Sequence, residues 1–207
     1  LNPLTASSKS KIQCEKKLSG IADSTFQITS LRFATACGYS PRLRLDLVLN
    51  DFVASALINK KIELLSDGTA WRPLIDVIDM ARSIHWAMIR SSGDNFLPIN
   101  IGSEEWNFTI RELAESVKTV IPSVNLIFAD GASPDKRSYK VDFNLFKSLA
   151  PDYQPTQKIE DTINEIATGI SNSTFRNRDF RNSHLSRLST LNYLRDKKLI
   201  NSNLEWT

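Results

Sequence analysis

Segments typical of β-strands alternate with segments typical of α-helices along most of this 207-residue chain, and that order constrains the fold more than any other feature. Strands are predicted at residues 26–37, 61–65, 96–102 and 125–130. Helices are predicted at residues 5–18, 46–60, 78–90, 109–120, 142–150 and 159–170. Because parallel strands need long connections that cross the sheet, this alternation favours an α/β fold with a mainly parallel sheet.

Two local patterns support these elements. Leu97, Ile99 and Ile101 alternate with other residues, which is the period of a strand. Thr109 and Glu112 have the S/T-x-x-E spacing of a capping box, which marks the start of a helix. The boundary between a strand and the following helix is therefore expected near residue 109.

Apolar spacing also predicts which faces are buried. The segment 26–37 is rich in β-branched and aromatic residues without alternation, which is typical of a strand covered on both faces. The helix at 78–90 is expected to place Met80, Ile84, Ala87 and Met88 on one face. The helix at 159–170 is expected to bury Ile159, Ile163, Ile166 and Ile170. A last short helix could dock through Leu185, Leu188, Leu191 and Leu194.

The first predicted helix carries a lysine on its apolar face. A cap near Thr5 or Ser7 starts the helix, and the four-three-four spacing of Ser7, Lys11, Cys14 and Leu18 places these residues on one face. A buried or half-buried lysine is costly unless another group pairs with it. Two interpretations are open: Lys11 serves a site, or Ser7 is only a cap and the long Lys11 side chain reaches solvent.

Composition excludes several classes of function. The net charge of +3 does not require a polyanionic partner. Cys14 and Cys37 both stand among apolar residues, which predicts reduced thiols and a cytoplasmic protein. His85 and His184 have no Cys or paired acid at ligand spacing, so no metal site is predicted. No apolar run approaches the ~20 residues that a membrane span needs, and no signal peptide opens the chain.

The glycines indicate whether the chain has a cofactor-binding loop, and the first residues indicate whether it is part of a longer protein. Seven glycines are scattered along the chain, and none has the G-x-G-x-x-G or P-loop spacing of a phosphate-binding loop. The chain opens with Leu1 in "LNPLTA", a turn-like approach to a helix. We therefore expect a piece of a longer, truncated protein.

Five motifs together resemble a known family. They are "NPLTASSKSKIQCE", "LRFATACG", "SDGTAWRPLIDVIDMARSI", "INIGS" and "GASPDKRSYKVDF", in this order. In order and spacing they resemble the extended short-chain dehydrogenase/reductases, in particular the NAD-dependent epimerase/dehydratase branch, whose members act on nucleotide-activated sugars. The resemblance begins just before the catalytic helix and implies the C-terminal portion of a Rossmann-like NAD(P)-binding fold plus a small α/β substrate-binding domain.

The resemblance implies a domain organisation and a general activity. Residues 1–38 would belong to the second half of the Rossmann domain, and residues 39–170 to the substrate-binding domain, interleaved with the last Rossmann strand and helices at about 72–102. Residues 171–207, rich in Asn, Ser and Arg, would form a C-terminal extension. The implied activity is hydride transfer with NAD, or NADP, at a sugar carbon of a nucleoside-diphosphate sugar. The implied assembly is a homodimer that packs through the helix at 7–18.

The resemblance also assigns catalytic roles to two residues. Lys11 matches the lysine of the family's Tyr-x-x-x-Lys pair, which binds the nicotinamide ribose and lowers the pKa of the tyrosine one turn earlier. Ser7 stands in the position of that tyrosine, the acid/base of the reaction. Loss of a positioned acid/base typically costs ~10²–10⁴ in rate. A water held by Ser7 and Lys11 could recover part of this loss.

Three further residues match substrate-binding positions of the family. Arg72 and Arg137 match arginines that bind the substrate's diphosphate, since a guanidinium offers a planar fork of donors. Asn50 matches a residue that contacts the nucleotide or its phosphates. The alternative for the two arginines is a surface ion pair: with Asp76 or Asp79 for Arg72, and with Asp135 or Asp142 for Arg137. Asp76 replaces a histidine that is common in the family.

Two other functions stay open. The chain could be a catalytically impaired relative, or a fragment, that binds a nucleotide sugar without turning it over, because Ser7 replaces the tyrosine and no glycine-rich loop is present. The tail "FRNRDFRNSHLSRL" interleaves Arg176, Arg178, Arg181 and Arg187 with Phe175 and Phe180. That pattern loosely matches a nucleic-acid-binding surface in which aromatic rings stack on bases.

Overall fold

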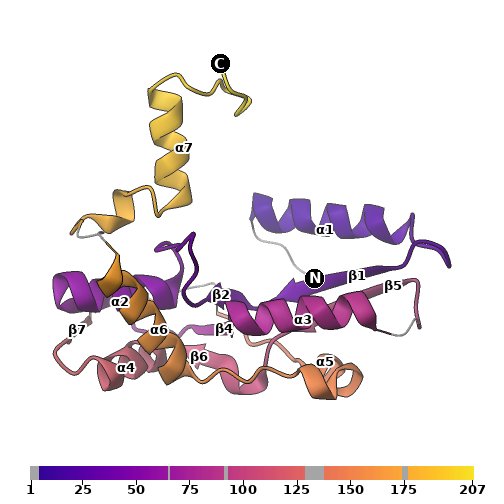
Figure 1. Ribbon diagram of the computed structural model, residues 1–207, viewed down its shortest axis with the longest axis horizontal. Helices are drawn as coiled ribbons and strands as arrows, with labels where there is room; N and C mark the ends of the chain where they lie inside the picture. Colours follow the sequence, from indigo (N-terminus) through magenta and orange to yellow (C-terminus); the bar gives the residue numbers. More distant parts are fainter. Residues whose placement is uncertain (1–4, 65, 91–92, 129–137, 174–176) are drawn as a thin grey trace.

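The computed structural model describes residues 5–64, 66–90, 93–128, 138–173 and 177–207 (Figure 1). Its strands are β1 (Ile28–Phe33), β2 (Thr35–Cys37), β3 (Lys61–Leu64), β4 (Trp71–Asp76), β5 (Phe96–Ile101), β6 (Asn107–Thr109) and β7 (Asn125–Phe128). Its α-helices are α1 (Ala6–Ser19), α2 (Val48–Asn59), α3 (Val77–Ile89), α4 (Ile110–Val120), α5 (Asn144–Leu149), α6 (Ile159–Asn172) and α7 (Arg187–Asp196). Three short 3-10 helices are η1 (Glu104–Trp106), η2 (Pro151–Tyr153) and η3 (Phe180–Asn182).

The strands form parallel pairs, and this confirms the predicted α/β class. β1 pairs with β5, β2 with β4, and β3 with β7, all in parallel, while β6 adds to β4 in the antiparallel direction. The single strand predicted at 26–37 is wrong, because the chain changes partner between β1 and β2. Ala34 lies at that break, where its N–H bonds to the carbonyl oxygen of Ile101. β1 is half-buried along its length, so the expected burial on both faces is wrong as well.

Two hydrophobic cores lie side by side, and β4 contributes to both. One core is formed by β1, β5, α3 and α5, and its centre includes Trp86, Ile99 and Phe146. The other is formed by α2, β3, α4 and α6 and receives Leu74 of β4, whereas Ile75 of β4 points into the first core. Figure 1 shows α2, α4 and α6 gathered at one end of the molecule and α3 and α5 at the other. The domain boundaries predicted from the sequence stay a prediction.

Several local predictions are confirmed. The alternating residues of β5 are its buried ones, and the Thr109–Glu112 capping box forms in full at the start of α4. On α6, Ile163, Ile166 and Ile170 are buried, as their spacing predicts. These elements bury the face that their apolar residues define.

The face predicted for α3 is only partly correct: Met80 and Ala87 pack against the core around β1 and β5, but Ile84 and Met88 are exposed. Its buried residues are Asp79, Ser83 and Trp86, whereas Met88 is 80% exposed and Ile84 is 44% exposed. The Asp79 carboxylate accepts hydrogen bonds from the backbone N–H groups of residues 156 and 157, and the Ser83 hydroxyl donates to the Asp79 carbonyl oxygen. These polar bonds set the rotation of the helix, which apolar spacing alone does not reveal.

The docking predicted for the last helix is only partly correct. A helix, α7, does form, but Leu188 is 68% exposed, and Figure 1 shows α7 standing away from the rest of the chain. The segment before α7 docks instead. There Phe180 is buried in the core around α2, and the Arg181 guanidinium makes two hydrogen bonds, of 2.7 and 2.8 Å, to the Asp51 carboxylate.

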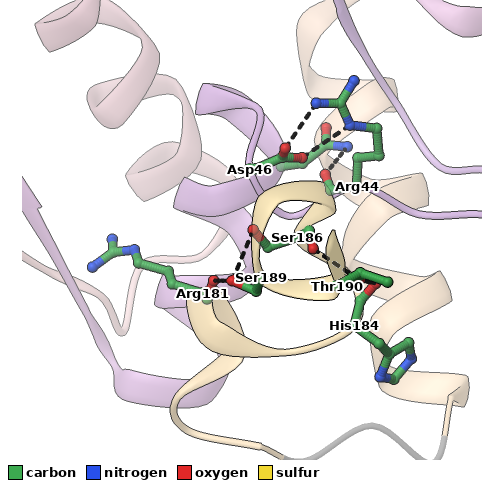
Figure 2. A network of polar contacts seen from close by, with 8 residues as sticks. Arg44, Asp46, Arg181, His184, Ser186, Ser189 and Thr190 are labelled. Atoms are coloured by element: carbon green, nitrogen blue, oxygen red, sulfur yellow. Dashed lines mark hydrogen bonds and ion pairs between the residues drawn. The ribbon is translucent and has the colours of Figure 1, made fainter. Parts of the chain in front are cut away.

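A polar network fixes the start of α7 (Figure 2). The Leu45 N–H donates to the Leu185 carbonyl oxygen, and the Ser189 hydroxyl donates to the Arg181 carbonyl oxygen. Arg44 makes a two-pronged pair with Asp46, and this pair lowers the pKa of the Asp46 carboxyl. The tail therefore holds the loop that precedes α2.

Asp76 joins three parts of the fold at the boundary of β4 and α3. One carboxylate oxygen accepts from the Ile78 N–H and caps α3, and the other accepts from the Thr162 hydroxyl of α6 at 2.7 Å. Gly38, with φ +109°, lies so close that a Cβ there would stand 2.8 Å from Asp76 Oδ2. Burial is the main cause that raises the pKa of Asp76 above its ordinary value of 3.8.

The first prediction concerns close packing on α6. A Cβ at Gly169 would lie 2.2 Å from the Tyr39 ring, whereas at Gly20 the nearest atom would be 3.5 Å away. We expect Gly169→Ala to lower the free energy of unfolding by about 1–3 kcal/mol, because the ring has to move. Gly20→Ala is the matched control and should change stability by less than ~0.5 kcal/mol. Equal unfolding curves for the two variants would contradict the packing described here.

The second prediction concerns Asp76 and pH. Its folded-state pKa is raised, so the folded protein binds the proton more tightly than the unfolded chain, and this group's contribution to stability falls as pH rises through the folded pKa. Asp76→Asn removes the charge; its amide oxygen can still accept from the Ile78 N–H, while its NH2 group would donate to the Thr162 hydroxyl instead of accepting from it. We expect urea unfolding to show Asp76→Asn gaining stability over the parent protein from acidic to neutral pH. A difference that is constant with pH would refute this.

Candidate functional site

A pocket of about 500 Å³ contains Lys11, and we call it the Lys11 pocket. Ser8, Lys11, Ile12 and Glu15 of α1 form one wall. Arg32 of β1 and Asn100 of β5 also line the pocket, and residues 139–142 complete its lining. The volume falls in the range of ~300–1,000 Å³ that is usual for small-molecule sites.

The helix wall begins at a side-chain cap. The Thr5 hydroxyl accepts a hydrogen bond from the Ser8 N–H at 3.1 Å, which confirms the cap predicted near Thr5. Lys16 and Lys17 lie in the last turn, where positive charge favours the carboxyl end of a helix. The sequence therefore sets the helix ends through capping and charge.

The inner face of α1 differs from the predicted one. Ser8, Ile12 and Glu15 are half-buried, whereas all members of the predicted face are exposed: Ser7, Lys11, Cys14 and Leu18. The buried or half-buried lysine is thus wrong, and so is the apolar surrounding predicted for Cys14. The reason is the ion pair of Glu15 with Arg32, which sets the rotation of the helix.

Ser7 and Lys11, the predicted catalytic pair, lie one turn apart on α1, and only Lys11 is among the lining residues of the pocket. Lys11 lines the pocket, while Ser7 is exposed and is not among the lining residues. Ser8 replaces it on the pocket wall, with its hydroxyl 2.8 Å from the Thr5 hydroxyl. A joint action of Ser7 and Lys11 stays a prediction.

The pocket lining carries three cations, Lys11, Arg32 and Lys140, and two carboxylates, Glu15 and Asp142. Arg32 is paired with Glu15, and the Asp142 carboxylate accepts from the Asn144 N–H at 2.7 Å, next to the start of α5. Lys11 and Lys140 are the two ammonium groups of the lining, the latter with its Nζ 3.6 Å from the centroid of the Trp71 ring. Ammonium groups and polar side chains around such a cavity suit a ligand that is rich in hydroxyl or phosphate oxygens.

The 139–142 side of the pocket is tied to three strands. The Trp71 N–H of β4 donates to the Ser138 hydroxyl at 3.0 Å. The Asn107 amide of β6 both accepts from the Val141 N–H and donates to its carbonyl oxygen. The Asn100 amide of β5 donates to the Asp142 carbonyl oxygen at 3.2 Å. This segment has no regular secondary structure, yet its position is fixed.

Arg72 lies beside this segment. Its Nη1 donates to the Trp71 carbonyl oxygen at 2.8 Å, and its guanidinium carbon is 5.8 Å from the centroid of the Tyr139 ring. Since Tyr139 also lines the Lys11 pocket, the structure brings Arg72 next to a residue of the pocket wall. Arg137 lies outside the described residues.

Asn50 has a different environment. It is buried, its Oδ1 accepts from the Gly38 N–H, and its Nδ2 donates to the carbonyl oxygens of Gly38 and Arg44. Both ends of the amide therefore hold the loop between β2 and α2. A contact of Asn50 with a nucleotide stays a prediction.

Two tail residues that the nucleic-acid hypothesis relies on, Phe180 and Arg181, are engaged within the fold. Phe180 is buried, so it cannot stack on a base, and the Arg181 guanidinium is bonded to Asp51. Phe175 and Arg176 lie outside the described residues. The predicted role of Phe180 in stacking is wrong because the ring fills the core around α2.

Other features of the described residues bear on ligands. No group of three His, Cys, Asp or Glu side chains within them could hold a metal ion. Among the described residues, no helix has the length and apolar character that crossing a membrane requires. Cys37 is buried as predicted, and burial raises the pKa of its thiol.

Sequence reasoning missed Tyr139 and Lys140 as pocket residues. Both belong to the motif "GASPDKRSYKVDF", in which only Arg137 was singled out. The signal was present, since this motif was expected to contact the substrate. The Glu15–Arg32 pair had no such signal, because the two residues lie on different elements.

Comparison with known proteins finds a family model that matches part of the chain and solved structures with a similar fold. Residues 1–102 match the model of the NAD dependent epimerase/dehydratase family. MoeE5 in complex with UDP-glucose and NAD is similar at 20% identity and a TM-score of 0.69, over 84% of this chain and 58% of that one. UDP-N-acetylglucosamine 4-epimerase from Methanobrevibacter ruminantium M1 is similar at 20% identity and a TM-score of 0.70, over 84% and 56%.

A third solved structure is similar to this chain to about the same degree. UDP-glucuronic acid 4-epimerase from Bacillus cereus is similar at 22% identity and a TM-score of 0.67, over 82% of this chain and 54% of that one. This chain thus spans little more than half the length of these proteins, and at such identities they show a shared fold. The family model covers α1 with Lys11, and also Arg32 and Arg72. The match to the NAD dependent epimerase/dehydratase family thus covers residues 1–102, just under half of this chain.

Proposed function

We propose that this chain carries the lysine-bearing and substrate-binding part of a NAD-dependent enzyme that acts on a nucleoside-diphosphate sugar. The reaction class is epimerisation, dehydration or keto-reduction, each of which begins with hydride transfer at a sugar carbon. The observation that carries the proposal is the position of Lys11. It lies in the region that matches the family model, and it lines a pocket large enough for a sugar.

The described residues fit one end of the cofactor. The Lys11 ammonium offers three donors, which suit the hydroxyls of a ribose. None of the seven glycines has the spacing of a dinucleotide-binding loop, so this chain offers no such loop for the pyrophosphate. When bound, NAD would accept or return the hydride. The role of this chain is then to hold the ribose through Lys11 and the sugar nucleotide through its own cleft.

Arginines are proposed to bind the diphosphate. Arg72 lies beside the pocket wall that residues 139–142 form, and Arg137 precedes that segment by two residues. A guanidinium donates two parallel hydrogen bonds to a phosphate, so it fixes orientation as well as charge. Asn50 is retained as a weaker proposal, because its amide is engaged with backbone groups.

A second candidate function is binding without turnover. It is favoured by Ser7, which lacks a phenol and is exposed outside the Lys11 pocket. In that case the chain would bind a nucleotide sugar through the same residues, but no acid/base would stand at position 7. The two candidates differ in catalysis and agree on the ligand.

Association of two copies through α1 is a further part of the proposal. The outward residues of this helix are mostly polar and include Lys9, Lys16 and Lys17. Light scattering of the purified chain would report the mass in solution. A monomer at all concentrations tested would refute a dimer that forms through this chain alone.

The third prediction tests the diphosphate site. We expect Arg72→Lys to weaken binding of UDP at least ~10-fold, because an ammonium cannot replace the two-pronged contact of a guanidinium. Isothermal titration with UDP measures this. Arg195→Lys on the exposed helix α7 is the matched control and should bind as the parent does. Equal affinities for the parent and the Arg72 variant would contradict the assignment.

The fourth prediction separates the two candidates. The chain is joined to the dinucleotide-binding half of a relative such as MoeE5, and turnover of UDP-glucose is measured with and without Ser7→Tyr. If catalysis is retained by the rest of the site, we expect the tyrosine to raise turnover by ~10²–10⁴. No gain, with unchanged binding of UDP-glucose, would favour the binding protein.

A further inference from the structure

The Lys11 pocket contains one phenol among its lining residues, that of Tyr139. It comes from the segment 139–142, whereas Lys11 and Ser8 of the same lining come from α1. The Tyr139 side chain is 49% exposed, so a ligand can reach it without displacing core residues. A phenol hydroxyl both donates and accepts hydrogen bonds, which matches the chemistry of a sugar hydroxyl.

The backbone of Tyr139 is held in place. Its N–H donates to the Trp71 carbonyl oxygen, and the Trp71 N–H donates to the Ser138 hydroxyl just before it. Two residues further on, Val141 is bonded on both sides of its peptide unit by the Asn107 amide. A side chain on such an anchored segment loses little freedom when it binds a ligand, which favours a precise contact.

The Tyr139 ring also contacts the proposed diphosphate-binding residue. The Arg72 guanidinium carbon lies 5.8 Å from the ring centroid, within the distance of a cation–π contact. One side chain thus borders both the pocket and the arginine. A ligand whose diphosphate is bound by Arg72 would place the group beyond its second phosphate, which is the sugar, near Tyr139.

We propose that Tyr139 contacts the sugar of a nucleoside-diphosphate sugar in the Lys11 pocket, with its phenol hydroxyl hydrogen-bonded to a sugar hydroxyl. This inference rests on the proposed function and identifies which residue distinguishes the sugar-bearing ligand from the free nucleotide.

The test compares two probes on the 207-residue chain. UDP-glucose and UDP are titrated into the parent and into Tyr139→Phe, which keeps the ring beside Arg72 and removes only the hydroxyl. We expect UDP-glucose to bind ~5- to 10-fold more weakly to Tyr139→Phe, as for the loss of one hydrogen bond, and UDP to bind equally to both. Tyr193→Phe on α7, which also removes an exposed phenol hydroxyl, is the matched control and should change neither affinity.

A second variant tests the ring itself. Tyr139→Leu removes the surface that faces Arg72, so we expect it to weaken the binding of UDP as well as that of UDP-glucose. Thermal unfolding of each variant shows that the fold is kept.

The outcomes are separable. If Tyr139→Phe binds both probes like the parent while Arg72→Lys loses UDP, the sugar contact is overturned and the proposed function stands. If the parent binds neither probe at millimolar concentration, the proposed function fails and the inference fails with it.

Discussion

The ion pair between Glu15 and Arg32 is the contact on which the arrangement of the site depends. It joins α1 to β1, and both side chains are partly shielded from water. Removal of one partner would leave a partly buried charge without its partner, which costs more than the pair contributes. Because the pair fixes the rotation of α1, it turns Ser8 and Lys11 toward the pocket and leaves Ser7 outside. The helix α1 therefore carries both Lys11, which matches the lysine of the family motif, and Ser7, which stands where the family has a tyrosine.

Asp76 has a comparable role between the two cores. It links the end of β4 to α6 through Thr162 and leaves no room for a side chain at Gly38. Burying a carboxylate has an energetic cost, and the raised pKa of Asp76 expresses it. The contacts of Asp76 keep the core around β1 and β5 in a fixed position relative to the core around α2. The shape of the Lys11 pocket depends on this fixed position, since the segment that lines it is hydrogen-bonded to β4, β5 and β6.

The sequence predicted the fold class and the elements whose burial follows apolar spacing, such as β5, α4 and α6. It failed where polar bonds decide the orientation. On α3, the bonds of Asp79 outweigh the apolar stripe that ends at Met88, and on α1 the pair of Glu15 does the same. These bonds join residues far apart in the chain, so no local pattern contains them. For the site, Lys11 was found through its motif, whereas Tyr139 was missed although its motif had been recognised.

The anchoring of segment 138–142 has a consequence for the motions of the molecule. This segment belongs to no strand, yet the amide protons of Tyr139 and Val141 are bonded to the carbonyl oxygen of Trp71 and to the side chain of Asn107. They can exchange with solvent deuterium only when those bonds open. We therefore expect the amide protons of this irregular segment to exchange as slowly as those at the edge of a sheet. The pocket wall should open only when the strands that bind it open as well.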